Sequence, residues 1–91
     1  MPLIRICHQH GLGHDEACRT VRKIAAELAE RHGVDCQWQG DRLIFRRHGL
    51  DGSIDVHDDR VTVLARLGLA LLPIRGRLER EVEALLNRHF P

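Results

Sequence analysis

The sequence is poor in the features that several large functional classes require. It has two Phe, one Trp and no Tyr, and its 14 basic residues are nearly balanced by 13 acidic ones. Dedicated nucleic-acid-binding domains normally carry a strong basic excess and aromatic side chains on which bases stack. The composition therefore argues against nucleic acid as a partner.

Long apolar runs are also missing. The longest, from Leu67 to Ile74, is interrupted by Gly68 and Pro73 and is far shorter than the roughly 20 residues that span a bilayer. The opening segment, residues 1–8, has no basic region followed by a long apolar stretch and does not resemble a signal peptide. We therefore expect no transmembrane segment and a cytoplasmic location.

Cysteine is scarce as well. Cys7, Cys18 and Cys36 are odd in number and lack CxxC spacing, which makes a disulfide framework improbable. We expect reduced, partly buried thiols. No neighbouring residue is identified that would activate any of them as a nucleophile, so a structural role is the simpler interpretation.

What the sequence does contain is typical of one small globular domain over residues 1–91. Hydrophobic residues make up 43% and charged residues 30% of the chain. A chain of this length buries only about 60–65% of its unfolded surface, so the core must be small and leaves little room for an enclosed active site.

Hydrophobic periodicity predicts the secondary structure. A β-prone run covers Leu3 to His8, and helical spacing follows from about His14 to His32, with Gly33 as the C-terminal cap. The period then drops to two, which predicts four short strands. The turns between these strands are expected at Gln39–Asp41, Gly49–Gly52 and His57–Asp59, and helical spacing returns from Arg77.

The predicted fold class is α+β, with the element order β-α-β-β-β-β-α. Tight polar turns favour an antiparallel sheet of about five strands, with alternate side chains facing a core covered by two helices on one face. The first strand is expected to add at an edge or to pair with the last strand.

Histidine is abundant, with seven in the chain, and His8, His10 and His14 lie close in sequence to Cys18. Imidazole and thiolate bind zinc or copper, and His14 and Cys18 are one helical turn apart. However, Gly11 and Gly13 make the intervening stretch flexible, and no second ligand pair with finger-like spacing follows. We therefore predict no metal site and no cofactor, with exposed histidines or a helix-capping role for His14.

The tripeptide His57-Asp58-Asp59 resembles part of a catalytic relay, in which a carboxylate orients an imidazole. The rest of a relay is not apparent, because no side-chain hydroxyl lies in a nucleophile elbow such as GxSxG. The hydroxyl residues are Thr20, Ser53 and Thr62. An exposed hairpin turn explains the tripeptide more simply, and we predict that the protein is not an enzyme. An enzyme that uses His57 is kept as a third alternative.

The most suggestive feature is the apolar connection from Leu67 to Ile74. One interpretation is a core segment, such as a helical turn that closes the open end of the sandwich. The other is an exposed patch for a partner chain, a lipid-like ligand or a hydrophobic surface, flanked by Arg66, Arg75 and Arg77. The candidate binding side chains are Leu67, Leu69, Leu71, Leu72 and Ile74.

Several motifs together resemble a known family. They are Pro2-Leu3-Ile4-Arg5-Ile6, Trp38-Gln39-Gly40-Asp41-Arg42-Leu43, Gly49-Leu50-Asp51-Gly52-Ser53-Ile54 and Gly76-Arg77-Leu78-Glu79-Arg80-Glu81. In this order they resemble the polyhydroxyalkanoic acid system proteins, also called polyhydroxyalkanoate granule-region proteins. The resemblance implies a bacterial cytoplasmic protein linked to storage-polyester granules, with no established activity and no catalytic residues to assign. It matches Trp38, Gly40, Asp41, Gly49, Asp51 and Gly52 as structural turn and core positions.

Our leading expectation is therefore an accessory, non-enzymatic protein of polyhydroxyalkanoate metabolism. It would bind a granule or a granule protein, or act as a regulatory binding module, through the apolar segment. The alternative is a small domain that binds an acyl or hydroxyacyl compound between the sheet and the C-terminal helix. The candidate pocket residues are Trp38, Phe45, Val63 and Val82. A homodimer could form through a sheet edge or through the exposed stripe of a helix, and the sequence does not indicate the oligomeric state.

Overall fold

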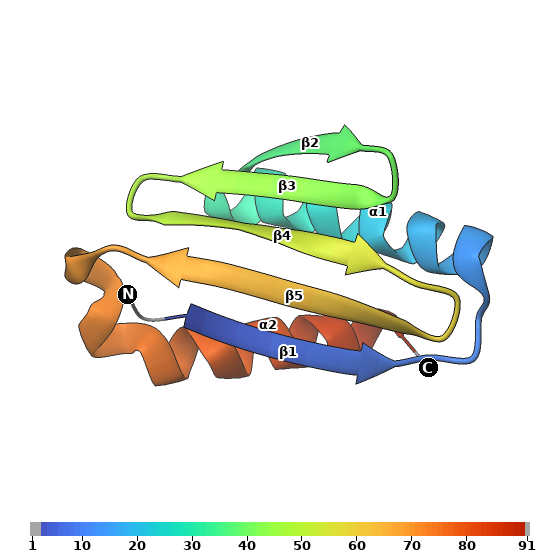
Figure 1. The fold of residues 1–91 in the computed structure, drawn as a ribbon. Helices are drawn as coiled ribbons and strands as arrows, with labels where there is room; N and C mark the ends of the chain where they lie inside the picture. The colour runs from blue at the N-terminus through green and yellow to red at the C-terminus, as the bar shows by residue number, and fades with distance from the viewer. Residues whose placement is uncertain (1–2, 91) are drawn as a thin grey trace.

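A computed structural model describes residues 3–90, and the Pro2 of the opening motif lies outside them. The elements follow the predicted order, with a short 3₁₀ helix, η1, added before the last helix (Figure 1). Their bounds are β1 Leu3–Gln9, α1 His14–His32, β2 Asp35–Gln39, β3 Arg42–Arg47, β4 Leu50–Val56, β5 Arg60–Leu67, η1 Leu69–Ile74 and α2 Arg75–His89. The predicted α+β fold is confirmed.

The first helix, α1, has the bounds that the periodicity predicted. Asp15 and Glu16 lie in its first turn, where the helix dipole favours negative charge. Gly33 ends it in the left-handed conformation, with φ of 62°, and the Val34 N–H then donates to the Leu28 carbonyl at 3.2 Å. A glycine adopts this conformation at no steric cost, so the chain can turn directly into β2.

All strand pairs of the sheet are antiparallel, in the order β1-β5-β4-β3-β2. The first strand lies at one edge and pairs with the last, from Leu3 opposite Arg66 to Gln9 opposite Arg60. Both predicted placements of this strand, at an edge of the sheet and beside the last strand, are confirmed. The other edge is β2, most of whose residues are exposed.

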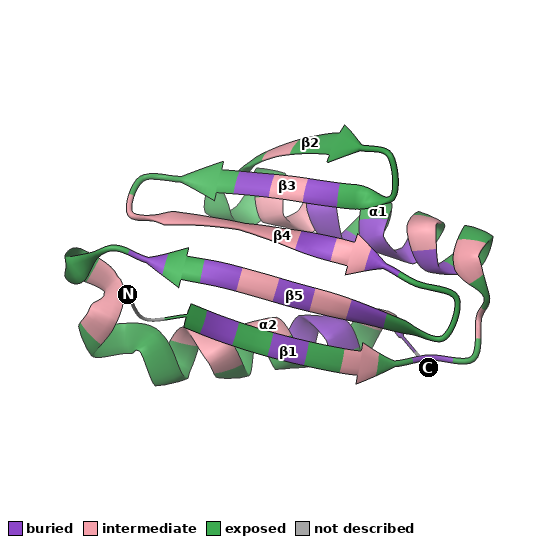
Figure 2. Cartoon of the chain, viewed as in Figure 1, coloured by how far each residue is buried: buried purple, intermediate pink, exposed green. Residues whose placement is uncertain are grey.

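The core lies between one face of the sheet and the two helices behind it (Figures 1 and 2). Along β5 the buried residues alternate with less buried ones, as the period of two predicts. The other face of the sheet is uncovered and carries charged pairs between neighbouring strands. Arg42 Nε lies 2.5 Å from Asp55 Oδ1, and Arg66 Nε lies 3.2 Å from Asp51 Oδ1.

One predicted turn is wrong. The chain reverses at His48 and Gly49, whereas Leu50 to Gly52 already belong to β4. Gly52 is required for another reason, because a Cβ there would lie 2.1 Å from the Leu64 carbonyl oxygen and 2.7 Å from the Phe45 ring. Gly52 therefore lets the backbone of β4 lie close to the Leu64 carbonyl and the Phe45 ring, and it is not a turn residue.

Candidate functional site

The apolar connection before α2 forms η1, and none of the side chains of η1 is fully buried. Leu69 is 87% exposed and Ile74 is 40% exposed. Leu71 and Leu72 are half-buried and pack against the margin of the core. Leu67 is only 3% exposed and belongs to β5. Of the five candidate binding residues, Leu69 and Ile74 therefore project into solvent, whereas Leu67 is a core residue that no partner can reach.

The arginines that flank η1 differ in their partners. Arg66 pairs with Asp51, and Arg77 Nε lies 3.4 Å from Glu81 Oε1. Arg75 donates from Nη2 to the Leu3 carbonyl oxygen at 2.9 Å. Within residues 3–90 no carboxylate pairs with Arg75. A fixed, uncompensated positive charge thus lies directly beside the exposed Ile74.

The candidate pocket between the sheet and α2 is a small apolar space. Phe45, Val63 and Val82 line it, but its volume is only about 70 Å³. Pockets for small-molecule ligands usually measure about 300–1,000 Å³. Trp38 lies elsewhere, 36% exposed on β2 with the Arg22 guanidinium 5.9 Å from its ring centre. The interior alone cannot enclose an acyl compound.

An open groove adjoins this space between α1 and α2, and we call it the helix groove. Its volume is about 270 Å³, and Leu28, Leu50 and Val82 line both it and the interior space. Arg31 and Arg88 also line it. The sequence patterns did not reveal this groove, because they give each helix an apolar stripe but not the distance between the two helices.

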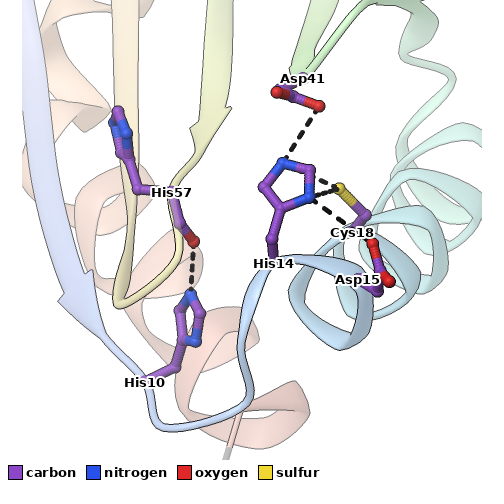
Figure 3. Close-up of polar contacts among 6 residues, drawn as sticks. All are labelled: His10, His14, Asp15, Cys18, Asp41 and His57. Atoms are coloured by element: carbon purple, nitrogen blue, oxygen red, sulfur yellow. Dashed lines mark hydrogen bonds and ion pairs between the residues drawn. The ribbon is translucent and has the colours of Figure 1, made fainter.

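His10 has a structural role at the end of the sheet opposite to η1. It is 8% exposed, and its Nδ1 accepts a hydrogen bond from the Leu12 N–H at 3.3 Å. The proton of the neutral ring is therefore on Nε2, which lies 3.2 Å from the His57 carbonyl oxygen and donates to it (Figure 3). The ring also stacks on Phe90, with 5.3 Å between centroids. His10 joins three parts of the chain and has no free nitrogen for a metal.

His14 and Cys18 are brought together on the first turns of α1. The Cys18 Sγ lies 3.9 Å from each nitrogen of the His14 ring. The β2–β3 turn adds a third group, because His14 Nε2 lies 3.0 Å from Asp41 Oδ1 (Figure 3). Sequence reasoning found the first two residues and missed Asp41, because the register of the hairpin against the helix is not a local property.

The tripeptide His57-Asp58-Asp59 lies at the predicted hairpin turn, between β4 and β5. All three residues are exposed. The His57 carbonyl accepts from His10, and Asp59 Oδ1 pairs with Arg60 at 2.9 Å. Among residues 3–90 no side-chain hydrogen bond joins His57 to either aspartate, so the arrangement does not resemble a relay.

The thiols fall into two groups. Cys18 and Cys36 are half-buried, as expected, whereas Cys7 is exposed on β1, contrary to the expectation. Burial raises the pKa of the Cys18 thiol, and the nearby Asp41 raises it further. Burial likewise raises the pKa of Cys36. Both thiols are therefore protonated and weakly nucleophilic at neutral pH.

Comparison with known families and structures gives two matches. The sequence model of the family described as "Putative polyhydroxyalkanoic acid system protein" matches residues 4–90. No curated protein matches the chain significantly. Among residues 3–90, neither helix is long and apolar enough to cross a membrane.

The solved NMR structure of PA4090 from Pseudomonas aeruginosa is similar in fold. It superposes with a TM-score of 0.63 at 11% sequence identity, covering 97% of this chain and 83% of that chain. At this level of identity the likeness concerns the fold alone.

Proposed function

This chain belongs to the family of polyhydroxyalkanoic acid system proteins, and from that premise we propose that it is a non-enzymatic accessory protein that binds storage granules. The contact would be made by η1, either with the granule surface or with a protein on it. The raised thiol pKa values and the exposed His57 turn support a role without catalysis.

The observation that carries the proposal is the exposure of Leu69, at 87%, next to Ile74 at 40%. Burying a leucine fully is worth about 1.5–3 kcal/mol relative to leaving it in water. An aliphatic polyester offers the apolar surface that these side chains lack. Arg75, which pairs with no carboxylate among residues 3–90, suits an anionic or amphiphilic boundary around such a surface.

The test is co-sedimentation of the purified chain with native polyhydroxyalkanoate granules and, separately, with phospholipid vesicles. The decisive variant is the double substitution Leu69→Gln and Ile74→Gln, because both side chains are exposed and the fold should survive. Leu71 and Leu72 are poorer choices, since they pack against the core. We expect granule binding to fall at least about tenfold, which corresponds to about 1.4 kcal/mol.

Trp38→Gln is the matched control, because it removes an exposed apolar side chain on the edge strand β2, which β3 and β4 separate from β5 and η1. Binding should persist in this variant. Unchanged binding of the folded double variant would contradict the role of η1. Failure of the unaltered chain to bind granules would overturn the proposal, and equal binding to vesicles would assign η1 to lipid in general.

A second candidate function is favoured by the helix groove. The groove and the adjoining interior space together present an apolar floor, and Arg31, Arg88, Glu27 and Glu81 also line the groove. Arg88 pairs with Glu27, so Arg31 is the cation that would receive the carboxylate of an acyl or hydroxyacyl compound. Titration with a 3-hydroxy fatty acid, followed by methyl NMR, should then shift Leu28, Leu78 and Val82. Shifts confined to Leu69 and Ile74 would support η1 instead.

A further inference from the structure

The cluster of His14, Cys18 and Asp41 is the strongest arrangement of donor groups that the proposed function does not use. One potential ligand atom from each of the three residues lies within 4.8 Å of the other two. They come from two elements, the start of α1 and the β2–β3 turn. We propose that His14, Cys18 and Asp41 bind a divalent transition-metal ion, with Zn²⁺ as the ion that this donor set favours.

The chemistry of the donors supports Zn²⁺. Imidazole nitrogen, thiolate sulfur and carboxylate oxygen are the three kinds of protein ligand that zinc takes. Harder ions such as Mg²⁺ and Ca²⁺ require oxygen ligands and would leave the nitrogen and sulfur unused. The expectation of no metal site rested on His8, His10, His14 and Cys18 alone. The structure adds the Asp41 carboxylate to His14 and Cys18 as a third donor group.

The distances are close to those of a tetrahedral site. Zinc bonds of about 2.0–2.3 Å place neighbouring ligand atoms about 3.3–3.8 Å apart. His14 Nε2 and Asp41 Oδ1 are 3.0 Å apart, and Cys18 Sγ is 3.9 Å from His14. The Cys18 and Asp41 donor atoms lie within 4.8 Å of each other, so they must move closer together to share an ion.

The surroundings leave a side of the cluster open to solvent. The side chain of His14 is 33% exposed and that of Asp41 is 67% exposed, whereas Cys18 is half-buried. A water molecule can therefore complete the coordination. Asp15 Oδ1 lies 3.7 Å from His14 Nδ1 and adds negative charge beside the cluster, although it is too distant to hydrogen-bond the ring.

A catalytic Cys–His–Asp triad is the competing interpretation of the same three residues. In a triad the thiol hydrogen-bonds one ring nitrogen, and the carboxylate holds the other. Here Asp41 holds Nε2, which leaves Nδ1 for the thiol, but Sγ lies no closer to Nδ1 than to Nε2, at 3.9 Å from each. Burial and Asp41 also raise the pKa of the Cys18 thiol, whereas a catalytic thiol needs a lowered pKa. In a metal site His14 Nε2 would bind the ion through its in-plane lone pair, with Cys18 Sγ and an Asp41 oxygen as the other protein ligands.

The test uses the full chain after removal of metals with a chelator. Zn²⁺ alone is titrated by calorimetry, and Co²⁺ alone is titrated by absorbance, because a thiolate–cobalt bond produces a charge-transfer band. We expect one Co²⁺ site with that band, and a higher melting temperature with Zn²⁺, because an ion that binds only the folded chain stabilises it.

Two cysteine variants and one aspartate variant locate the site. Cys18→Ser should remove the charge-transfer band and weaken Zn²⁺ binding at least about tenfold, while Cys7→Ser, the matched control, keeps both. Asp41→Asn should weaken binding and keep the band. Circular dichroism without metal checks that each variant is folded. A band that survives Cys18→Ser, or an unaltered chain that shows no band, would overturn the proposal.

Discussion

The two ends of this domain carry opposite kinds of surface. At one end, η1 exposes Leu69 and Ile74 to solvent. At the other end, His10, His14 and Asp41 are polar, and each makes a polar contact with another part of the chain (Figure 3). One end exposes apolar side chains, and the other brings polar side chains of distant segments together.

The difference shows where this small domain can carry function. Most apolar residues of the sheet and helices lie in the core or pack against it, because a chain of this size has few to spare. Leu3 on β1 and Trp38 on β2 are exposed exceptions. We therefore expect changes at His10 and Phe90 to affect stability and changes at η1 to affect granule binding, with effects that decrease in the order given below.

The largest effect is expected for Phe90→Ala at the polar end. Phe90 is 3% exposed and lies against the rings of His8 and His10. Truncating a buried phenylalanine typically costs about 3–5 kcal/mol. Urea denaturation should show this loss, whereas Leu69→Ala should change the unfolding free energy by less than about 0.5 kcal/mol. Equal losses in the two variants would contradict this expectation.

A smaller loss is expected for His10→Ala. The substitution leaves the Leu12 N–H and the His57 carbonyl without their partner, and leaving partly buried groups unpaired costs about 1–3 kcal/mol. His48→Ala is the matched control, because His48 is exposed in the β3–β4 turn. If both variants were equally stable in chemical denaturation, the linking role of His10 would be wrong.

Within η1, Leu69 and Leu71 are expected to differ in their contributions to stability and to granule binding. Leu71→Ser should cost about 1 kcal/mol, because the half-buried side chain packs against the core. Leu69→Ser should leave stability within about 0.5 kcal/mol and reduce granule binding more. Thermal melts and co-sedimentation measure the two quantities. A larger stability loss for Leu69 than for Leu71 would refute this assignment of roles.

A pH-dependent effect is expected at Glu27, which belongs to neither end and joins α1 to α2. Partial burial alone would raise its pKa, but the hydrogen bond from His89 and the charge of Arg88 hold the pKa below its ordinary value of 4.5. A carboxyl whose pKa is lowered by folding stabilises the folded state above its unfolded pKa and stops doing so as the pH falls through the lowered value.

Glu27→Gln should therefore reduce stability at neutral pH, and the difference from the unaltered chain should shrink in acid. Denaturation curves at neutral pH, near pH 5 and near pH 3 would show this trend. Glu30→Gln, one turn further along the exposed side of α1, is the control and should show a smaller difference. A Glu27 effect independent of pH would indicate packing rather than charge.

By itself the sequence determined the order of the strands and the two α-helices, the bounds of α1 and the single buried face of the sheet. These follow from hydrophobic period and from glycine at the end of α1, and both are properties of neighbouring residues. Motif matching also identified the family. Local reasoning failed at Gly52, where a glycine that looked like part of a turn serves the packing of β4 against β5.

Only the tertiary structure decided which residues of these elements meet. It placed Asp41 beside His14, separated the exposed Leu69 from the half-buried Leu71, and opened the helix groove. These features depend on strand register and on the distance between helices, which are set by packing between segments far apart in the chain. A periodic pattern states which face of an element is apolar, but not which residue it will contact on another element.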